Sequence, residues 1–164
     1  MGQNVDNGRV SGDGTDGSRG YLAQDQNGQW QGGLGNPPQG SAAGFGGGIP
    51  IVVGGQLYGE QESGEYCASR GYAKQSSTNV GKVIIGYNST SNSLVLVVSP
   101  DGLESGGMTL DAIRDKLVGE GYDYVFGFDG GSSSTLIQDG DDVLVAPTWY
   151  KDNTIPAGVT VTGE

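Results

Sequence analysis

One stretch of this chain, residues 107–122, has the spacing of an amphipathic helix, whereas the other patterned stretches are short runs typical of strands. The apolar face of the expected helix is formed by Leu110, Ile113, Leu117 and Val118. Thr109 suits the N-cap of this helix, and Gly119 or Gly121 suits its end. One clear helix among short strands predicts a single α+β domain, with a mixed or mainly antiparallel sheet on which the helix packs.

Short β-branched runs separated by turn signals predict the strands. Residues 48–59 contain two such runs with a Gly-Gly turn between them. Residues 82–87 and 94–98 flank the polar turn "NSTSNS" and predict a hairpin. The run 94–98 is almost wholly apolar, so we expect a central strand that is buried on both faces. Further along, we expect a strand at 122–128, a hairpin over 134–147 that turns at 139–142, and a last strand at 157–163.

The first part of the chain is dominated by Gly, Asn, Asp, Gln and Ser. The chain has 33 Gly residues, and they crowd its first third. Residues 1–48 therefore predict coil or loops, with a hairpin at residues 21–31 around an Asn-Gly turn as the exception. We divide the chain into a Gly-rich, loop-rich segment at 1–43 and a folded domain at 44–164.

Charge and composition remove several classes of function. Lys and Arg total 8 against 19 Asp and Glu, a net charge of −11, which disfavours binding to nucleic acid or to a polyanionic membrane. His is absent, so Ser-His-Asp and Cys-His catalysis are excluded and no zinc is expected. Cys67 is the only cysteine, so no intrachain disulfide can form. No apolar run is long enough to span a membrane, and no signal peptide is visible.

The turn "FDGGSSSTL" at residues 128–136 combines groups that suit an anionic sugar ligand. Asp129 ends an expected strand, and the two glycines that follow let a ligand approach the backbone, whose N–H groups can form an anion-binding nest. The serines and the threonine add hydroxyl groups. A flexible surface turn is the simpler alternative. The turn is neither a P-loop nor a nucleophile elbow, because the residues that close those motifs are missing.

In its context this turn resembles that of the phosphodiester glycosidase family, the relatives of the lysosomal "uncovering enzyme". Strands of that family end in Asp-Gly-Gly-Gly-Ser-Ser-Thr, and Ser132 stands here at the third Gly. Three upstream segments match in the same order: "GGGIPIVVGGQ", "KVIIGYNSTSNSLVLVVSPDG" and the G-x-T-L of Gly107–Leu110. The resemblance covers residues 44–146. Lys82 replaces a family Arg, and the family's Asn-Gly-Gly-Phe-Phe-like stretch is not visible in residues 1–43.

The resemblance implies a hydrolase that cleaves the glycosidic bond of a sugar-1-phosphodiester. Asp129 and Asp101 are the implied catalytic carboxylates, which stabilise an oxocarbenium-like state or activate water. The implied substrate-binding residues are Lys82, Arg70, Gly130, Gly131, Ser132, Ser133, Ser134 and Thr135. A turn role for each carboxylate and a solvated surface role for each basic residue remain open.

Other interpretations stay open from the sequence. Tyr72, Tyr87 and Trp149 could stack on a sugar, although core packing is the commoner role of aromatic residues. Calcium could bind at "SGDGTDGS", although this segment lacks EF-hand spacing and the closing Glu, or at "QDGDD", where a tight charged turn is the favoured interpretation. A non-catalytic carbohydrate-binding module, or a cell-surface or phage structural module, is the alternative to an enzyme. An extracellular or cell-surface location is compatible with either.

Overall fold

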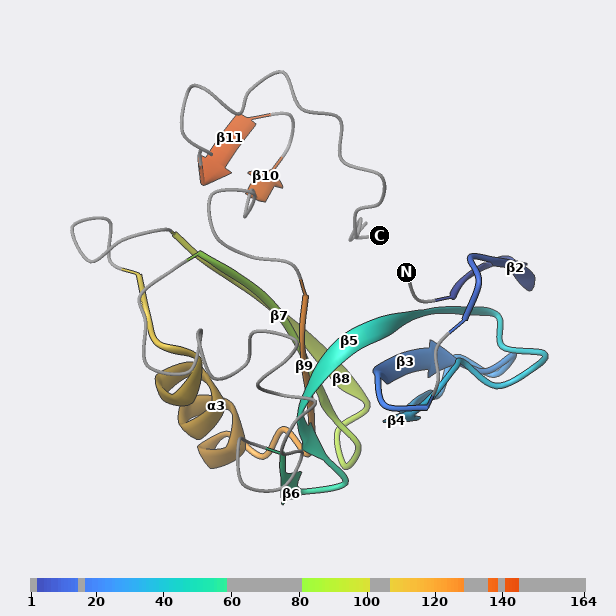
Figure 1. Cartoon of the computed structure of the whole chain (residues 1–164), viewed down its shortest axis with the longest axis horizontal. Helices are drawn as coiled ribbons and strands as arrows, with labels where there is room; N and C mark the ends of the chain where they lie inside the picture. Colours follow the sequence, from blue (N-terminus) through green and yellow to red (C-terminus); the bar gives the residue numbers. More distant parts are fainter. Residues whose placement is uncertain are drawn as a thin grey trace.

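The computed structural model describes residues 3–14, 17–58, 81–100 and 107–128, and the backbone of two further strands at 136–138 and 141–144. The described chain is an α+β domain with a mainly antiparallel sheet and one helix, as the sequence predicts (Figure 1). Its elements are β1 (Asn4–Asp6), β2 (Arg9–Ser11), β3 (Gly20–Gln24), β4 (Trp30–Leu34), β5 (Ala43–Val53), β6 (Gln56–Leu57), β7 (Lys82–Asn88), β8 (Ser93–Ser99), α3 (Leu110–Gly119), β9 (Tyr124–Gly127), β10 (Leu136–Gln138) and β11 (Asp141–Leu144).

The long strand β5 organises the main sheet. Its first half pairs with β1 and β3, and its second half pairs with β6 and β9, all antiparallel. The order continues from β9 to β7 and then β8. The pairing of β5 with β6 confirms the predicted Gly-Gly turn, and the pairing of β10 with β11 confirms the hairpin expected over 134–147. The strand expected at 157–163 lies outside the described residues.

Strands β7 and β8 form the expected hairpin, in register from Asn88 opposite Ser93 to Lys82 opposite Ser99. Within the described residues β8 is the last strand of the sheet, where a central strand was expected at 94–98, and Leu94 is 39% exposed. Side chains of β8 pack on both faces of the sheet, since Val95 contacts one core cluster and Leu96 the other. The apolar composition of β8 indicates that both faces of the sheet are covered there. It does not indicate whether β8 has a neighbouring strand on each side.

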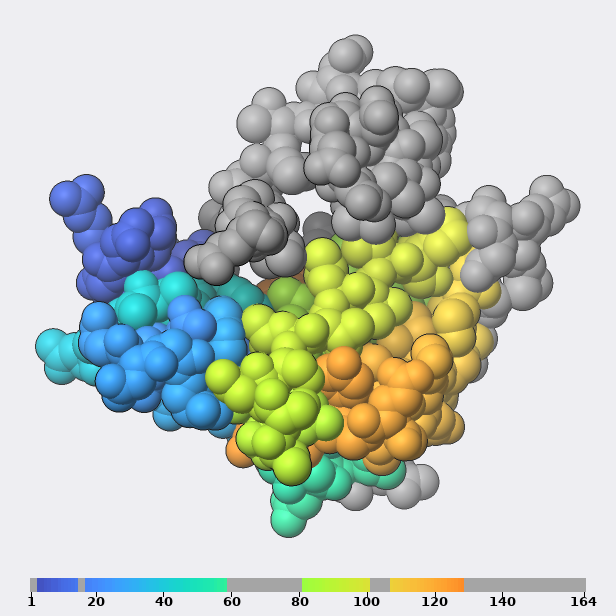
Figure 2. All heavy atoms as spheres, turned by 180° about the vertical axis from the view of Figure 1, so that it is seen from behind, coloured from blue at the N-terminus to red at the C-terminus, as the bar shows by residue number. Residues whose placement is uncertain are grey.

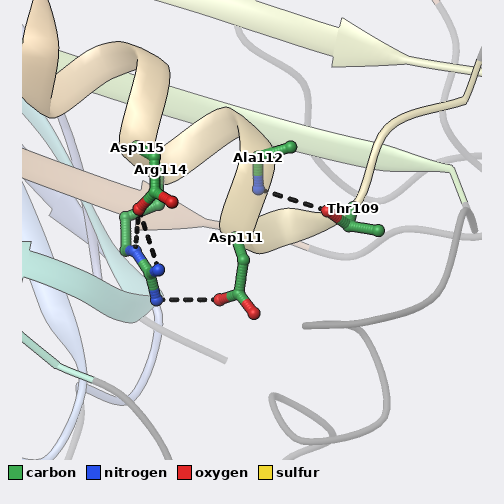
Figure 3. Close-up of polar contacts among 5 residues, drawn as sticks. All are labelled: Thr109, Asp111, Ala112, Arg114 and Asp115. Atoms are coloured by element: carbon green, nitrogen blue, oxygen red, sulfur yellow. Dashed lines mark hydrogen bonds and ion pairs between the residues drawn. The ribbon is translucent and has the colours of Figure 1, made fainter.

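The helix α3 begins and ends as predicted. The Thr109 hydroxyl accepts a hydrogen bond from the Ala112 N–H at 3.2 Å, which caps the first turn (Figure 3). Just beyond Gly119, Gly121 has a φ of 88°, the left-handed conformation typical of a helix end. Three of the predicted apolar residues, Leu110, Ile113 and Leu117, are buried, whereas Val118 is 41% exposed. Arg114 forms ion pairs with Asp111 and Asp115 on the outer surface (Figure 3).

The sheet separates two apolar clusters. On the helix side, the three buried residues of α3 pack against Ile51, Ile84 and Val125. The other cluster contains Leu22, Ile85, Tyr87 and Phe126, with Trp30 packed against it. Neighbouring residues of β7 and β9 thus contribute to different clusters, as the period of two in a strand requires. Strands β3 and β4 cover the face that the helix leaves open (Figure 1).

The coil expected over residues 1–48 is therefore wrong where β1, β2 and the first half of β5 lie. The hairpin at 21–31 is confirmed as β3–β4, and β1, β2 and β5 add further strands. Glycine permits this packing, because a Cβ on Gly20 would lie 2.0 Å from the Phe126 ring and one on Gly32 2.5 Å from the Tyr124 ring. The division of the chain at 43/44 stays a prediction.

Hydrogen bonds join the β3–β4 hairpin to strand β7 and to the turn between β7 and β8. The backbone N–H of Trp30 donates to the Asn92 side-chain oxygen at 3.0 Å, and the Tyr87 hydroxyl donates to the Trp30 carbonyl at 2.6 Å. In the space-filling view the residues around 20–35, in light blue, lie directly against this green hairpin (Figure 2). The Gly-rich segment is thus a packed layer of the domain.

We expect the Gly20→Ala substitution to destabilise the fold by about 1–3 kcal/mol, because the Phe126 ring must move to admit a methyl group. Urea unfolding followed by tryptophan fluorescence measures this change. Gly119→Ala is the matched control, since a Cβ at Gly119 meets no atom within 4 Å. The control is expected to be neutral or to stabilise the helix by about 0.5–1 kcal/mol. Equal stability of Gly20→Ala and wild type would contradict the packing of this segment on Phe126.

Candidate functional site

Of the residues predicted to form a site, the described part of the chain contains Lys82. The others lie outside the described residues and their assignment stays a prediction: Asp129, Asp101, Arg70, Gly130, Gly131, Ser132, Ser133, Ser134 and Thr135. The structure does describe the strands that directly precede the two predicted carboxylates in the sequence.

These strands and β7 meet at one end of the sheet. Strand β7 lies between β9 and β8. At its start, Lys82 lies opposite Ser99, the last residue of β8, and Ile84 lies opposite Gly127, the last residue of β9. The Phe128 N–H donates to the Val83 carbonyl at 2.8 Å, which holds the end of β9 beside the start of β7. The chain continues from these two strand ends toward Asp101 and Asp129.

Lys82 is buried at this end of the sheet. The residue is 1% exposed, and the Lys82 Nζ donates a hydrogen bond to the Met108 carbonyl at 2.9 Å. A solvated surface role for Lys82 is therefore wrong. An ammonium group out of water needs hydrogen-bond acceptors, and the Met108 carbonyl supplies one of them. Met108, the residue to which this ammonium group is bonded, directly precedes Thr109, the N-cap of α3.

Ser99 is a polar residue of this region that sequence reasoning missed. It is 3% exposed, and its hydroxyl accepts a hydrogen bond from the Met108 N–H at 2.9 Å. A signal was present in the sequence, because a serine ends the apolar run "LVLVVS" directly before Pro-Asp-Gly. Buried hydroxyls are almost always hydrogen-bonded, so a serine at that point predicts a backbone partner.

Tyr87 does not form a stacking surface. It is 1% exposed and lies in the core, where its hydroxyl donates to Trp30 and accepts from the Gln29 side chain at 2.9 Å. Burial raises the pKa of the Tyr87 phenol above its ordinary value, so the hydroxyl keeps its proton and remains a donor. Tyr72 and Trp149 lie outside the described residues.

Within the described ranges, no group of three or more His, Cys, Asp or Glu side chains is placed to hold a metal ion. The segment "SGDGTDGS" is described only in part, and the side chains of "QDGDD" lie outside the described residues. Calcium at either place stays an alternative from the sequence. In the same part of the chain, no helix is long and apolar enough to cross a membrane.

The fold is similar to that of a solved catalytic domain, the zebrafish N-acetylglucosamine-1-phosphodiester alpha-N-acetylglucosaminidase domain auto-inhibited by its pro-peptide. The TM-score is 0.65 at 15% sequence identity, over 87% of this chain and 50% of that chain. A hypothetical protein from Synechocystis aligns with a TM-score of 0.46 at 15% identity, over 82% of this chain and 32% of that one. No family model and no curated protein matches the sequence.

At this level of identity the likeness to the zebrafish domain establishes a shared fold. The chain spans about half of the length of that solved structure. Residue roles do not transfer through a fold alone, because one fold supports many activities.

Proposed function

We propose that this chain hydrolyses the glycosidic bond of a sugar-1-phosphodiester. The observation that carries the proposal is the likeness of 87% of the chain to the catalytic domain of an N-acetylglucosamine-1-phosphodiester alpha-N-acetylglucosaminidase. The same type of enzyme is implied independently by the Asp-Gly-Gly turn and the ordered segments upstream of it.

The arrangement of the strand ends supports this proposal. Ser99 and Gly127 end two strands that flank the start of β7, so the chain leaves the sheet toward both predicted carboxylates from neighbouring positions. The net charge of the chain is −11, which opposes the approach of an anionic substrate. The buried Lys82 supplies a positive charge at this end of the sheet, beside the positively polarised start of α3.

The proposed chemistry needs few groups, because a phosphate ester is a good leaving group. Asp129 stabilises the oxocarbenium-like state or activates the attacking water, and Asp101 is the second carboxylate. Backbone N–H groups and hydroxyls of residues 130–135 bind the phosphate or the sugar. Arg70 is the proposed direct partner of the phosphate charge, since a guanidinium binds phosphate oxygens in a bidentate manner.

Release of free sugar from a panel of sugar-1-phosphodiesters tests the proposal. The panel includes N-acetylglucosamine and other sugars, with and without calcium. The matched controls are the sugar-1-phosphate monoesters and glycosides of the same sugars with an uncharged leaving group. Release from the diesters alone is expected. If no diester releases sugar while the protein retains a glycan in a binding assay, the chain is a carbohydrate-binding module and the proposed activity is wrong.

A further inference from the structure

The backbone N–H and the backbone carbonyl of Met108 are each hydrogen-bonded to a side chain from the sheet. The Met108 N–H donates to the Ser99 hydroxyl at 2.9 Å, and the Met108 carbonyl accepts from the Lys82 Nζ at 2.9 Å. Lys82 and Ser99 face each other across the β7–β8 ladder. We call these three residues the Met108 clamp. It fixes the chain directly before α3 to the ends of two strands.

The Met108 clamp joins a helix to a sheet through buried polar groups, which is unfavourable in free energy of desolvation. Lys82 is 1% exposed and Ser99 is 3% exposed, so both polar groups are removed from water. A cation beside the N-cap of α3 also opposes the helix dipole, which favours negative charge at that end. Apolar residues of similar volume often serve stability equally well in a buried position. The polar clamp therefore indicates a demand for a defined geometry.

The place of the clamp suggests what that geometry serves. The clamp lies at the end of the sheet where β8 and β9 finish, and the Phe128 N–H bonds to Val83, the neighbour of Lys82. A side chain that is 1% exposed offers almost no surface to a dissolved substrate, which argues against direct phosphate binding by Lys82. The same burial suits a residue that acts through the backbone it holds.

We propose that Lys82 and Ser99 are positioning residues: by holding Met108 they fix the start of α3 against the start of β7 and the end of β8, and so set the geometry of the reaction at this end of the sheet. The catalytic part of this inference rests on the proposed function. A misplacement of about 1 Å can lower a rate about 10²-fold, so loss of the clamp acts on turnover more than on binding.

The test compares Ser99→Ala and Lys82→Met with wild type in two measurements. Amide hydrogen exchange at Met108–Ala112 is expected to be faster by about fivefold, the factor that corresponds to one lost hydrogen bond. For the hydrolysis, kcat is expected to fall by about 10–100-fold in both variants, and KM is expected to change little in Ser99→Ala, which keeps the charge of Lys82. Ser99→Thr, which keeps the hydroxyl, is expected to restore both values. If Lys82→Met does not fold, Ser99→Ala alone decides the test.

Two variants serve as matched controls. Ser93→Ala removes a serine at the opposite end of β8, and Lys116→Met removes an exposed lysine of α3. Both are expected to leave the exchange at Met108–Ala112 and the hydrolysis unchanged.

Two results would overturn the positioning role. The first is unchanged exchange at Met108–Ala112 in both clamp variants. The second is a large rise in KM for Lys82→Met together with an unaffected Ser99→Ala, which would assign Lys82 to direct substrate binding. If wild type releases no sugar, the proposed function fails, and the exchange measurement alone still supports or overturns the positioning of α3 by the clamp.

Discussion

Replacement of Asp129 by Asn is expected to lower sugar release from a sugar-1-phosphodiester by about 10²–10⁴-fold, the range for loss of a positioned acid or base. The asparagine keeps the size of the side chain and its hydrogen-bonding oxygen. It removes the negative charge that stabilises an oxocarbenium-like state and the base that activates water. We expect the effect in kcat, since the proposed binding of the sugar and the phosphate falls to other groups of the turn.

Steady-state kinetics with the best diester of the panel measure this effect. Asp115→Asn is the matched control, because the Asp115 side chain is 67% exposed on α3 and is expected to leave kcat unchanged. Asp101→Asn is compared in the same assay. Wild-type activity in Asp129→Asn together with a large loss in Asp101→Asn would transfer the main catalytic role to Asp101. Full activity in both variants would contradict the proposed pair of carboxylates.

Phe126→Ala is expected to destabilise the fold by about 3–5 kcal/mol, the usual cost of removing a fully buried aromatic side chain. Phe126 is 0% exposed and lies in the cluster that β3 and β4 cover, with its ring against Gly20. Truncation leaves a cavity between the sheet and this hairpin. The hairpin can collapse only partly, because β3 is paired with β5.

Urea unfolding of Phe126→Ala and wild type gives this difference in free energy. Leu94→Ala is the control, since Leu94 is 39% exposed on β8, and its loss is expected to stay within about 0.5 kcal/mol. A loss for Phe126→Ala as small as that of the control would mean that residues 20–34 do not pack on Phe126 in solution.

Local patterns were sufficient for the elements whose signals are local. The helix was predicted from its apolar spacing and from Thr109, and the hairpins from turn residues between β-branched runs. The order of strands in the sheet was not predictable, as β8 shows, because an apolar strand can be the last one of the described sheet when both faces of the sheet are covered. The packing of Gly20 and Gly32 was missed because it depends on aromatic rings about 100 residues further along the chain.

The candidate site was predictable only in part for a similar reason. The resemblance to a family singled out Lys82, but its burial and its bond to Met108 depend on the helix and two strands coming together. Ser99 was missed because one serine in an apolar run gives a weak signal without its partner. Asp129 and Asp101 remain predictions from the sequence, and the two substitutions described above test them.

The length of β5 has a consequence for how the molecule unfolds. Because one uninterrupted strand carries β1 and β3 on its first half and β6 and β9 on its second, neither half can lose its conformation without loosening the other. We therefore expect a single cooperative transition that includes the Gly-rich segment. A chain shortened to begin at residue 44 would expose the Phe126 face and leave the first half of β5 unpaired, and an unpaired strand beside an exposed apolar face is a site of aggregation.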